Sequence, residues 1–300
     1  MRLPRVLVLG GGELGSAVSH RLVRAGFQVF VADLALPTCI RRGVSFATAL
    51  MDGSARVEGI GAVRAASVAE ALAIARVGLI AVVTVGVGEG ARATGAMRKT
   101  RAGVGKDAVA GERRQIARLA RALGARVVVD ARMLKRAGVI SRRSAPLVVG
   151  LGPGLRAPKD AHAIIETNRG HNLGRVILKG TAEPDTGTPG EIGGRRAERV
   201  IRAPASGAFR AEVALGSMVR KDETLGKILP GEAMVRATIS GLLRGLIADG
   251  IPVKRGQKIG DVDPRGRAVD PLTISDKARA VAGGVLEAIM NWWAGPDARP

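Results

Sequence analysis

The feature that most constrains the fold is a glycine loop set between a hydrophobic strand and a helix near the N-terminus. Residues 5–9 predict a strand, and the run Gly-Gly-Gly-Glu-Leu-Gly follows at once over 10–15. Apolar residues then recur at helical spacing until Gly26, and a second strand over 27–32 leads into Asp33. Strand, glycine loop, helix, strand and acid, in this order, are typical of a Rossmann βαβ unit.

Each glycine of this loop has a physical task in such a unit. Gly10 permits the tight turn, Gly12 lets a pyrophosphate approach the backbone, and Gly15 lets the helix pack on the strand. Glu13 would repel a phosphate unless its side chain points away, and a Rossmann-like domain whose glycines serve packing alone is the alternative. The predicted cofactor-binding residues of this region are Gly10, Gly11, Gly12, Gly15 and Asp33.

Strands and helices continue to alternate after Asp33, which predicts a mostly parallel sheet. The expected helices are 37–51, 68–76 (capped by Ser67) and 112–123, and the expected strands are 77–85 and 126–130. Residues 86–111 are rich in Gly, Arg and Lys without a clear period, so we interpret them as a basic insertion. We assign residues 1–183 to a Rossmann-like domain that binds a nucleotide or cofactor.

A second candidate ligand loop lies at 166–175, directly after an apolar run. It places a carboxylate, two amides, an imidazole and two guanidinium groups among glycines, and loops with so many donors commonly contact ligands. A solvated loop is the alternative. The predicted ligand contacts of this loop are Asn168, Arg169 and His171.

The C-terminal part contains a gapless internal repeat at an offset of 34 residues. Matching pairs are Ala203 and Ala237, Ser206 and Ser240, Gly207 and Gly241, Gly216 and Gly250, and Val219 and Val253. After a Gly/Pro-rich linker over 184–198, residues 199–268 are therefore expected to form a small duplicated all-β module. The spacing resembles the barrel-sandwich hybrid of biotinyl and lipoyl carriers. Val235 stands where the modified lysine would be, which argues against a carrier role.

A terminal helix is expected over 269–293, with one apolar stripe along it. Gly283 and Gly284 interrupt this stripe and suggest close packing against a neighbouring element. We interpret the Trp292–Trp293 pair as a core or subunit contact, so a homo-oligomer is one expected state.

Composition limits the classes of partner. Lys and Arg number 47 against 26 Asp and Glu, which gives a net charge of +21, yet the chain has no Tyr, four Phe and two Trp. Such an excess of charge fits nucleic acid, an anionic cofactor, an acidic partner surface or a general bias of composition. Modules for single-stranded nucleic acid stack bases on aromatic rings, so nucleic-acid binding is ranked below the compositional bias. A single Cys39 and three scattered His predict no protein metal site. No apolar run approaches the roughly 20 residues of a membrane helix, and a cytoplasmic location is expected.

Several strings resemble the selenium-dependent molybdenum hydroxylase system proteins, distant associates of the xanthine dehydrogenase accessory factors. The strings lie at 10–22, 37–46, 129–133, 150–154, 166–175, 189–194, 261–266 and 274–278. The resemblance implies an accessory protein that matures a molybdenum hydroxylase client and binds or handles a molybdopterin-type or nucleotide cofactor. It carries over no catalytic residue.

Two other functions stay open at this stage. An NAD(P)-dependent oxidoreductase would use the same glycine loop, although no recognisable acid–base pair accompanies it. A non-catalytic scaffold would use the duplicated module to dock a partner enzyme.

Overall fold

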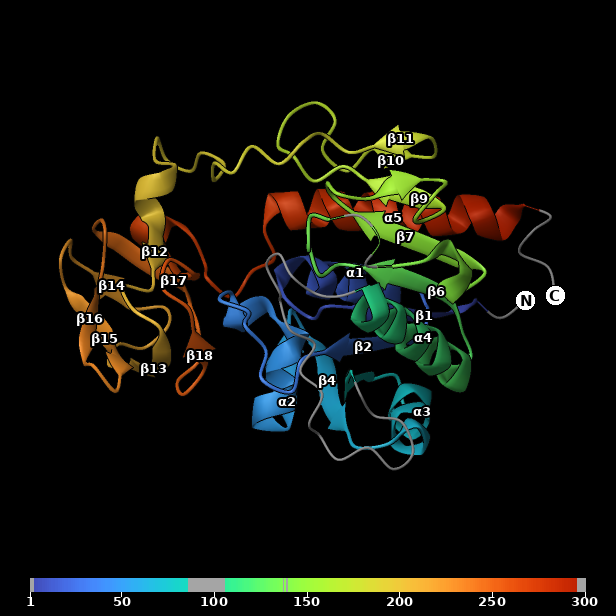
Figure 1. Ribbon diagram of the computed structural model, residues 1–300, viewed down its shortest axis with the longest axis horizontal. Coiled ribbons are helices and arrows are strands. Elements are labelled where there is room, and N and C mark those ends of the chain that lie inside the picture. Colours follow the sequence, from blue (N-terminus) through green and yellow to red (C-terminus); the bar gives the residue numbers. More distant parts are fainter. Residues whose placement is uncertain (1–2, 86–105, 137, 139, 296–300) are drawn as a thin grey trace. The chain divides into compact units, whose positions relative to one another are not determined.

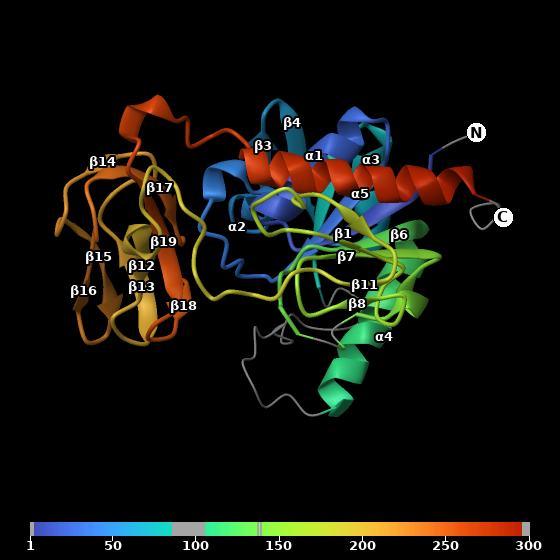
Figure 2. The ribbon, with the colours of Figure 1, turned by 90° about the horizontal axis from the view of Figure 1, so that it is seen from above.

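The computed structural model describes residues 3–85, 106–136, 138 and 140–295, which form two compact units (Figures 1 and 2). The first unit comprises Met1–Pro37, Phe46–Asp185 and Ile274–Pro300, and the second comprises Thr38–Ser45 and Thr186–Thr273. The terminal helix therefore belongs to the first unit, although it follows the second unit in the chain.

The first unit is built on a nine-stranded sheet with the order β10-β9-β7-β6-β1-β2-β5-β4-β3 (Figure 1). Its strands are β1 (Arg5–Leu9), β2 (Val29–Asp33), β3 (Ser54–Val57), β4 (Ile60–Ala65), β5 (Ile80–Thr84), β6 (Ala125–Asp130), β7 (Leu147–Leu151), β9 (Ala163–Ile165) and β10 (Val176–Ile177). Only the pairings of β3 and β10 are antiparallel, so the predicted mostly parallel sheet is confirmed. A separate two-stranded ribbon joins β8 (Arg156–Ala157) and β11 (Gly180–Thr181).

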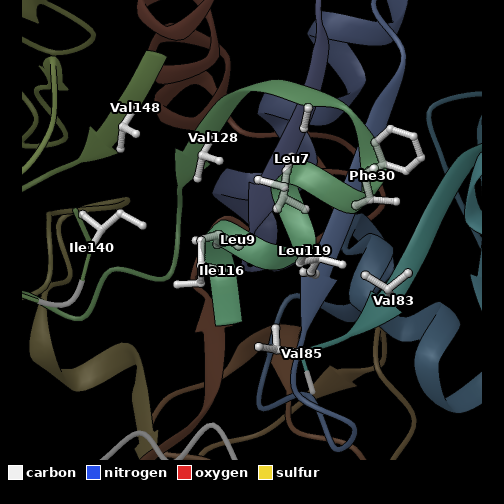
Figure 3. Close-up of a cluster of buried hydrophobic side chains, with 14 of the residues drawn as sticks. Leu7, Leu9, Phe30, Val83, Val85, Ile116, Leu119, Val128, Ile140 and Val148 are labelled. Carbon is white, nitrogen blue, oxygen red and sulfur yellow. The ribbon is translucent and has the colours of Figure 1, made fainter. Parts of the chain in front are cut away.

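Helices cover both faces of this sheet. They are α1 (Glu13–Arg24), α2 (Ala49–Asp52), α3 (Val68–Arg76), α4 (Lys106–Leu123) and α5 (Asp276–Ala294). On one face, Leu7 and Leu9 of β1 pack with Ile116 of α4 in a fully buried cluster (Figure 3). Because successive strand residues point to opposite faces, Val6 and Val8 lie on the other face, where α1 and α5 run side by side (Figures 1 and 2).

Local sequence signals predicted α3 correctly but also predicted a long helix that the structure does not contain. Helix α3 begins where expected, and the Ser67 hydroxyl accepts a hydrogen bond from the Glu70 amide at 3.1 Å. The helix expected over 37–51 is wrong: two 3₁₀ turns, η1 (Arg42–Val44) and η2 (Phe46–Thr48), precede the short α2. Tertiary partners take the backbone donors there, since the Phe46 amide donates to the Ser16 hydroxyl at 2.8 Å. Of the proposed insertion 86–111, residues 86–105 lie outside the described residues.

The second unit consists of two four-stranded sheets related by the sequence repeat. One has the order β12-β19-β17-β14 and the other β16-β15-β13-β18, so an offset of 34 residues relates the two sheets strand by strand. The strands are β12 (Val200–Arg202), β13 (Gly207–Ala211), β14 (Met218–Val219), β15 (Thr224–Leu229), β16 (Ala233–Arg236), β17 (Gly241–Leu246), β18 (Pro252–Val253) and β19 (Lys258–Asp263).

Hydrogen bonds repeat at the same offset. The Lys221 amide donates to the Ser240 hydroxyl at 2.9 Å, and the Arg255 amide donates to the Ser206 hydroxyl at 3.0 Å. The duplication predicted from the sequence is thus present as two equivalent halves, each supplying the other's partners. Val235, which stands where a carrier has its modified lysine, lies within β16 and is buried.

Helix α5 packs closely at Gly284 but not at Gly283, although the sequence suggested close packing at both. A Cβ built on Gly284 would lie 2.0 Å from the Gly174 carbonyl oxygen, whereas one on Gly283 would meet nothing nearer than the Arg21 guanidinium at 3.8 Å. The Arg126 guanidinium lies 5.6 Å from the Trp292 ring centroid and 6.0 Å from that of Trp293. Within the described residues, the helices fall short of the length and apolarity that crossing a membrane would need.

Candidate functional site

The site is built where the parallel strands of the first unit end. Strand β1 pairs with β2 on one side and with β6 on the other, so the order of strands reverses at β1. Ligands of open α/β sheets bind outside the carboxyl ends of the strands at such a reversal. The glycine loop leaves β1 at this point.

The glycines of the loop divide into two groups by geometry. Gly10 has a φ of +91°, and a Cβ on Gly15 would lie only 1.8 Å from the Gly10 carbonyl oxygen. These two serve the turn and the packing of helix on strand. Gly12 is the N-cap of α1 with φ −70° and ψ −174°, a conformation open to any residue. In the described part of the chain, the amides of Gly12 and Leu14 donate no hydrogen bond, so both can serve a ligand.

Asp33 closes the other side of the loop. Its Oδ2 accepts the Gly11 amide at 2.7 Å, and its Oδ1 accepts the Leu34 amide at 2.7 Å. The Gly11 carbonyl in turn accepts the Ser16 hydroxyl at 2.8 Å and the Ala47 amide at 3.1 Å. The two hydrogen bonds hold the Asp33 carboxylate in place beside the glycine loop.

The loop after β6 lies next to the glycine loop, since a Cβ on Gly10 would lie 3.2 Å from Ala131 and Arg132. Arg132 is buried between Asp130 and Glu112, with an Nη2 to Oδ2 distance of 2.6 Å to Asp130. Burial alone would lower the pKa of Arg132, but the two carboxylates raise it above its usual value. Met133 and Lys135 hold left-handed φ values of 54° and 56°, which are uncommon for non-glycine residues and cluster at ligand sites.

The second glycine turn holds the β6 loop in this shape. A Cβ on Gly154 would lie 2.3 Å from the Arg136 amide nitrogen, so the two loops are in direct backbone contact. The glycine turn at 151–154 therefore supports the loop after β6.

The loop after β9 is organised around a carboxylate. Glu166 is buried and accepts the amides of Thr167, Asn168 and Glu183 at 2.6 to 2.7 Å. Arg169 forms a two-pronged ion pair with Asp276 at 2.5 and 2.9 Å.

The three predicted ligand contacts of the β9 loop are arranged differently from one another. The side-chain amide of Asn168 donates to the Glu183 carboxylate at 2.5 Å, and the Arg169 guanidinium pairs with Asp276 at the start of α5. His171 is exposed and makes no hydrogen bond to a described residue. Two of the three predicted contacts are therefore engaged by carboxylates from outside the loop, Glu183 and Asp276.

Lys277, which the sequence analysis did not single out, lies near the glycine loop and the β9 loop. It lies in the first turn of α5 and makes no hydrogen bond or ion pair with a described residue. Burial lowers its pKa, and the charges of Arg169 and Lys135 lower it further, against the opposing charges of Glu13 and Glu166. Lys277 therefore lies within electrostatic reach of both α1 and the β9 loop. Only the short string Ser-Asp-Lys at 275–277, a helix start, marked it in the sequence.

The histidines and carboxylates give no indication of a metal site. No group of three or more His, Cys, Asp or Glu side chains within the described ranges is arranged to hold an ion. His162 accepts the Val148 amide at its Nδ1 at 2.9 Å, and burial, aided by Arg142, lowers its pKa despite this hydrogen bond. The Nδ1 of His162 is therefore engaged by the backbone of β7.

Comparison with known proteins gives a relative without an assigned function. No protein-family model matches the chain. It is 41% identical over 285 residues to the uncharacterized protein YqeB of Escherichia coli (strain K12), a match that covers 95% of this chain and 47% of YqeB. The chain thus spans about half the length of this relative.

Solved structures match weakly. A succinylglutamate desuccinylase/aspartoacylase from Rhodobacter sphaeroides is 26% identical over 23% of this chain and 22% of its own, with a TM-score of 0.21. The apo ectoine utilization protein of Ruegeria pomeroyi is 11% identical over 87% of this chain and 86% of its own, with a TM-score of 0.24.

These comparisons overturn the resemblance to the selenium-dependent molybdenum hydroxylase system family. The similar solved structures are aspartoacylase-type and ectoine utilization proteins. The predicted maturation role, with its molybdenum hydroxylase client and molybdenum cofactor, is therefore wrong. The strings at 10–15, 150–154 and 166–175 hold packing glycines and the buried Glu166, so loop geometry constrains these residues.

Proposed function

We propose that the first unit is a Rossmann-like domain that binds a dinucleotide of the NAD type at the glycine loop. The observation that carries this proposal is the exit of the loop from β1 where the strand order reverses. The order β5-β2-β1-β6-β7-β9 corresponds to the 3-2-1-4-5-6 order of doubly wound dinucleotide-binding sheets.

The pyrophosphate would lie against the start of α1. The Gly12 and Leu14 amides supply donors, and the helix dipole adds partial positive charge there. Glu13 opposes an anion at this point, but the charge of Lys277 acts on the same carboxylate and offsets it. Lys277 also offers a mobile ammonium to the phosphates, since no described residue engages it.

Asp33 would bind the ribose next to the pyrophosphate. A carboxylate accepts hydrogen bonds from the 2′ and 3′ hydroxyls of NAD and repels the 2′-phosphate of NADP. We expect the wild type to bind NAD⁺ more tightly than NADP⁺ by about tenfold or more. Asp33→Asn removes the charge and leaves a single acceptor oxygen, so one of the Gly11 and Leu34 amides loses its partner. The change should weaken NAD⁺ binding and narrow the preference for NAD⁺ over NADP⁺. Calorimetric titration of both nucleotides measures this, and a preference unchanged by Asp33→Asn would contradict the role.

Lys277 provides a second test, because its effects on stability and on binding are opposite in direction. A lysine whose folded-state pKa is lowered carries its charge at a cost in the native protein, so Lys277→Met should leave the melting temperature equal or higher at neutral pH. The same change should weaken NAD⁺ binding by about tenfold, the size of one charged hydrogen bond. The exposed Lys159→Met is the control for loss of one positive charge. A lower melting temperature with unaltered affinity would show that Lys277 is structural.

A further inference from the structure

A groove in the first unit lies along α1, beyond the glycine loop. It has a volume of about 530 Å³ and is bounded by α1, the start of α5 and the turn between β3 and β4. Its apolar lining consists of Ala17 of α1, Ala25 just after α1, Ile274 just before α5 and Ala282 of α5. Pockets that bind small molecules have volumes of roughly 300–1,000 Å³, so the groove is large enough for a metabolite.

A carboxylate at the groove is already neutralised by its neighbours. Glu58 Oε1 accepts the Arg279 guanidinium at 2.5 Å and the Ile274 amide at 2.8 Å, and His20 Nε2 lies 3.9 Å from Oε2. Burial would raise the pKa of Glu58, but the hydrogen bonds from Arg279 and Ile274 and the charges of Arg279 and His20 bring it below its usual value. Glu58 is therefore an ionised anchor for Arg279.

Two further guanidinium groups line the groove without such an anchor. The guanidinium groups of Arg21 and Arg24 make no hydrogen bond or ion pair with any residue that the structure describes. The Arg21 guanidinium passes near Gly283, where a Cβ would lie 3.8 Å from its Nη1. The groove thus presents three arginines against a single carboxylate.

From this arrangement we propose that the groove binds a compact polyanion that carries two or more carboxylate or phosphate groups. Guanidinium groups bind both kinds of anion in the same two-pronged geometry. The alanine lining leaves room for a short carbon or phosphate backbone between the arginines. Arg21 and Arg24 lie 8 and 11 residues beyond Glu13 along α1, a rise of roughly 12 and 16 Å, so these two arginines are distinct from the helix start proposed for the pyrophosphate.

The test uses citrate and inorganic pyrophosphate as probes in equilibrium dialysis against the full chain. Citrate represents the polycarboxylate source and pyrophosphate the phosphate source. We expect at least one probe to bind the wild type, and Arg21→Ala/Arg24→Ala to weaken that binding by about 100-fold, tenfold for each charged contact. The matched control is Arg64→Ala/Arg76→Ala, which removes two exposed arginines of the same unit and changes the net charge equally. Circular dichroism confirms that each variant is folded.

The outcomes separate this proposal from that for the glycine loop. Binding that survives Gly12→Val but is lost in Arg21→Ala/Arg24→Ala assigns the probe to the groove. Binding that is lost only in Gly12→Val places the probe at the glycine loop and overturns the groove proposal. An equal loss in the Arg64→Ala/Arg76→Ala control would show a general charge effect and overturn it too, as would failure of both probes to bind the wild type.

Discussion

Gly284→Ala should strongly destabilise the first unit, whereas Gly283→Ala should stabilise it. The two residues are adjacent in α5, and alanine gains roughly 1 kcal/mol of helix propensity over glycine at either. At Gly284 the added Cβ would lie 2.0 Å from the Gly174 carbonyl oxygen, which is backbone and cannot rotate away. Gly174 is itself fixed, since its amide donates to the Glu166 carbonyl at 3.0 Å and its φ is +85°.

The size of the effect follows from overpacking. Forcing a methyl group into a filled contact costs about 1–3 kcal/mol or more, so the two variants should differ by roughly 3 kcal/mol in free energy of unfolding. Denaturant titration of both variants beside the wild type measures this difference. Because both changes add the same methyl group to the same helix, equal stabilities would show that α5 does not pack against Gly174 as described.

Gly12→Val should abolish dinucleotide binding and leave the fold intact. The φ of −70° and ψ of −174° at Gly12 are open to valine, so the backbone has no reason to move. A branched side chain at the helix N-cap would occupy the space in which a pyrophosphate must approach the Gly12 and Leu14 amides. We expect the affinity for NAD⁺ to fall by about 100-fold or more, since several charged hydrogen bonds are lost together.

The matched control for this change is Gly231→Val. Gly231 lies in the second unit with nothing within 4 Å of a built Cβ, so the same substitution there adds bulk without a neighbour. Calorimetric titration with NAD⁺ and thermal unfolding should be run on both variants. Wild-type affinity in Gly12→Val would overturn the assignment of the glycine loop, and so would the absence of NAD⁺ binding in the wild type.

Sequence patterns predicted elements that depend on neighbours in the chain. The Ser67 cap is an example, because the hydroxyl and the Glu70 amide that it caps are three residues apart. Local patterns failed to predict the structure where backbone N–H groups donate to residues distant in the sequence. The stretch 37–51 has a helical pattern of apolar residues, but the Phe46 and Ala47 amides bond to Ser16 and Gly11 instead.

The candidate site shows the same division. Gly12 and Asp33 could be chosen from the sequence, because a turn, a helix start and a strand end are local requirements of the backbone. Arg169 was chosen for its chemistry, and the structure pairs it with Asp276, a residue 107 positions away. Lys277 was marked only as part of a helix start, since its surroundings depend on charges brought by the β9 loop, the loop after β6 and α1.

Two features could be predicted from residue spacing alone, the strand–loop–helix–strand–acid order and the 34-residue duplication, because both are local patterns of the chain. The return of α5 to the first unit, where it packs along α1 after the whole β-module has intervened, is visible only in the folded protein. That return brings Lys277 to the glycine loop and Arg279 to Glu58. The physical reason is that the hydrophobic effect depends on the apolar area that is buried and not on how far apart the contacting residues lie in the chain. Contacts between distant residues therefore cannot be predicted from residue spacing.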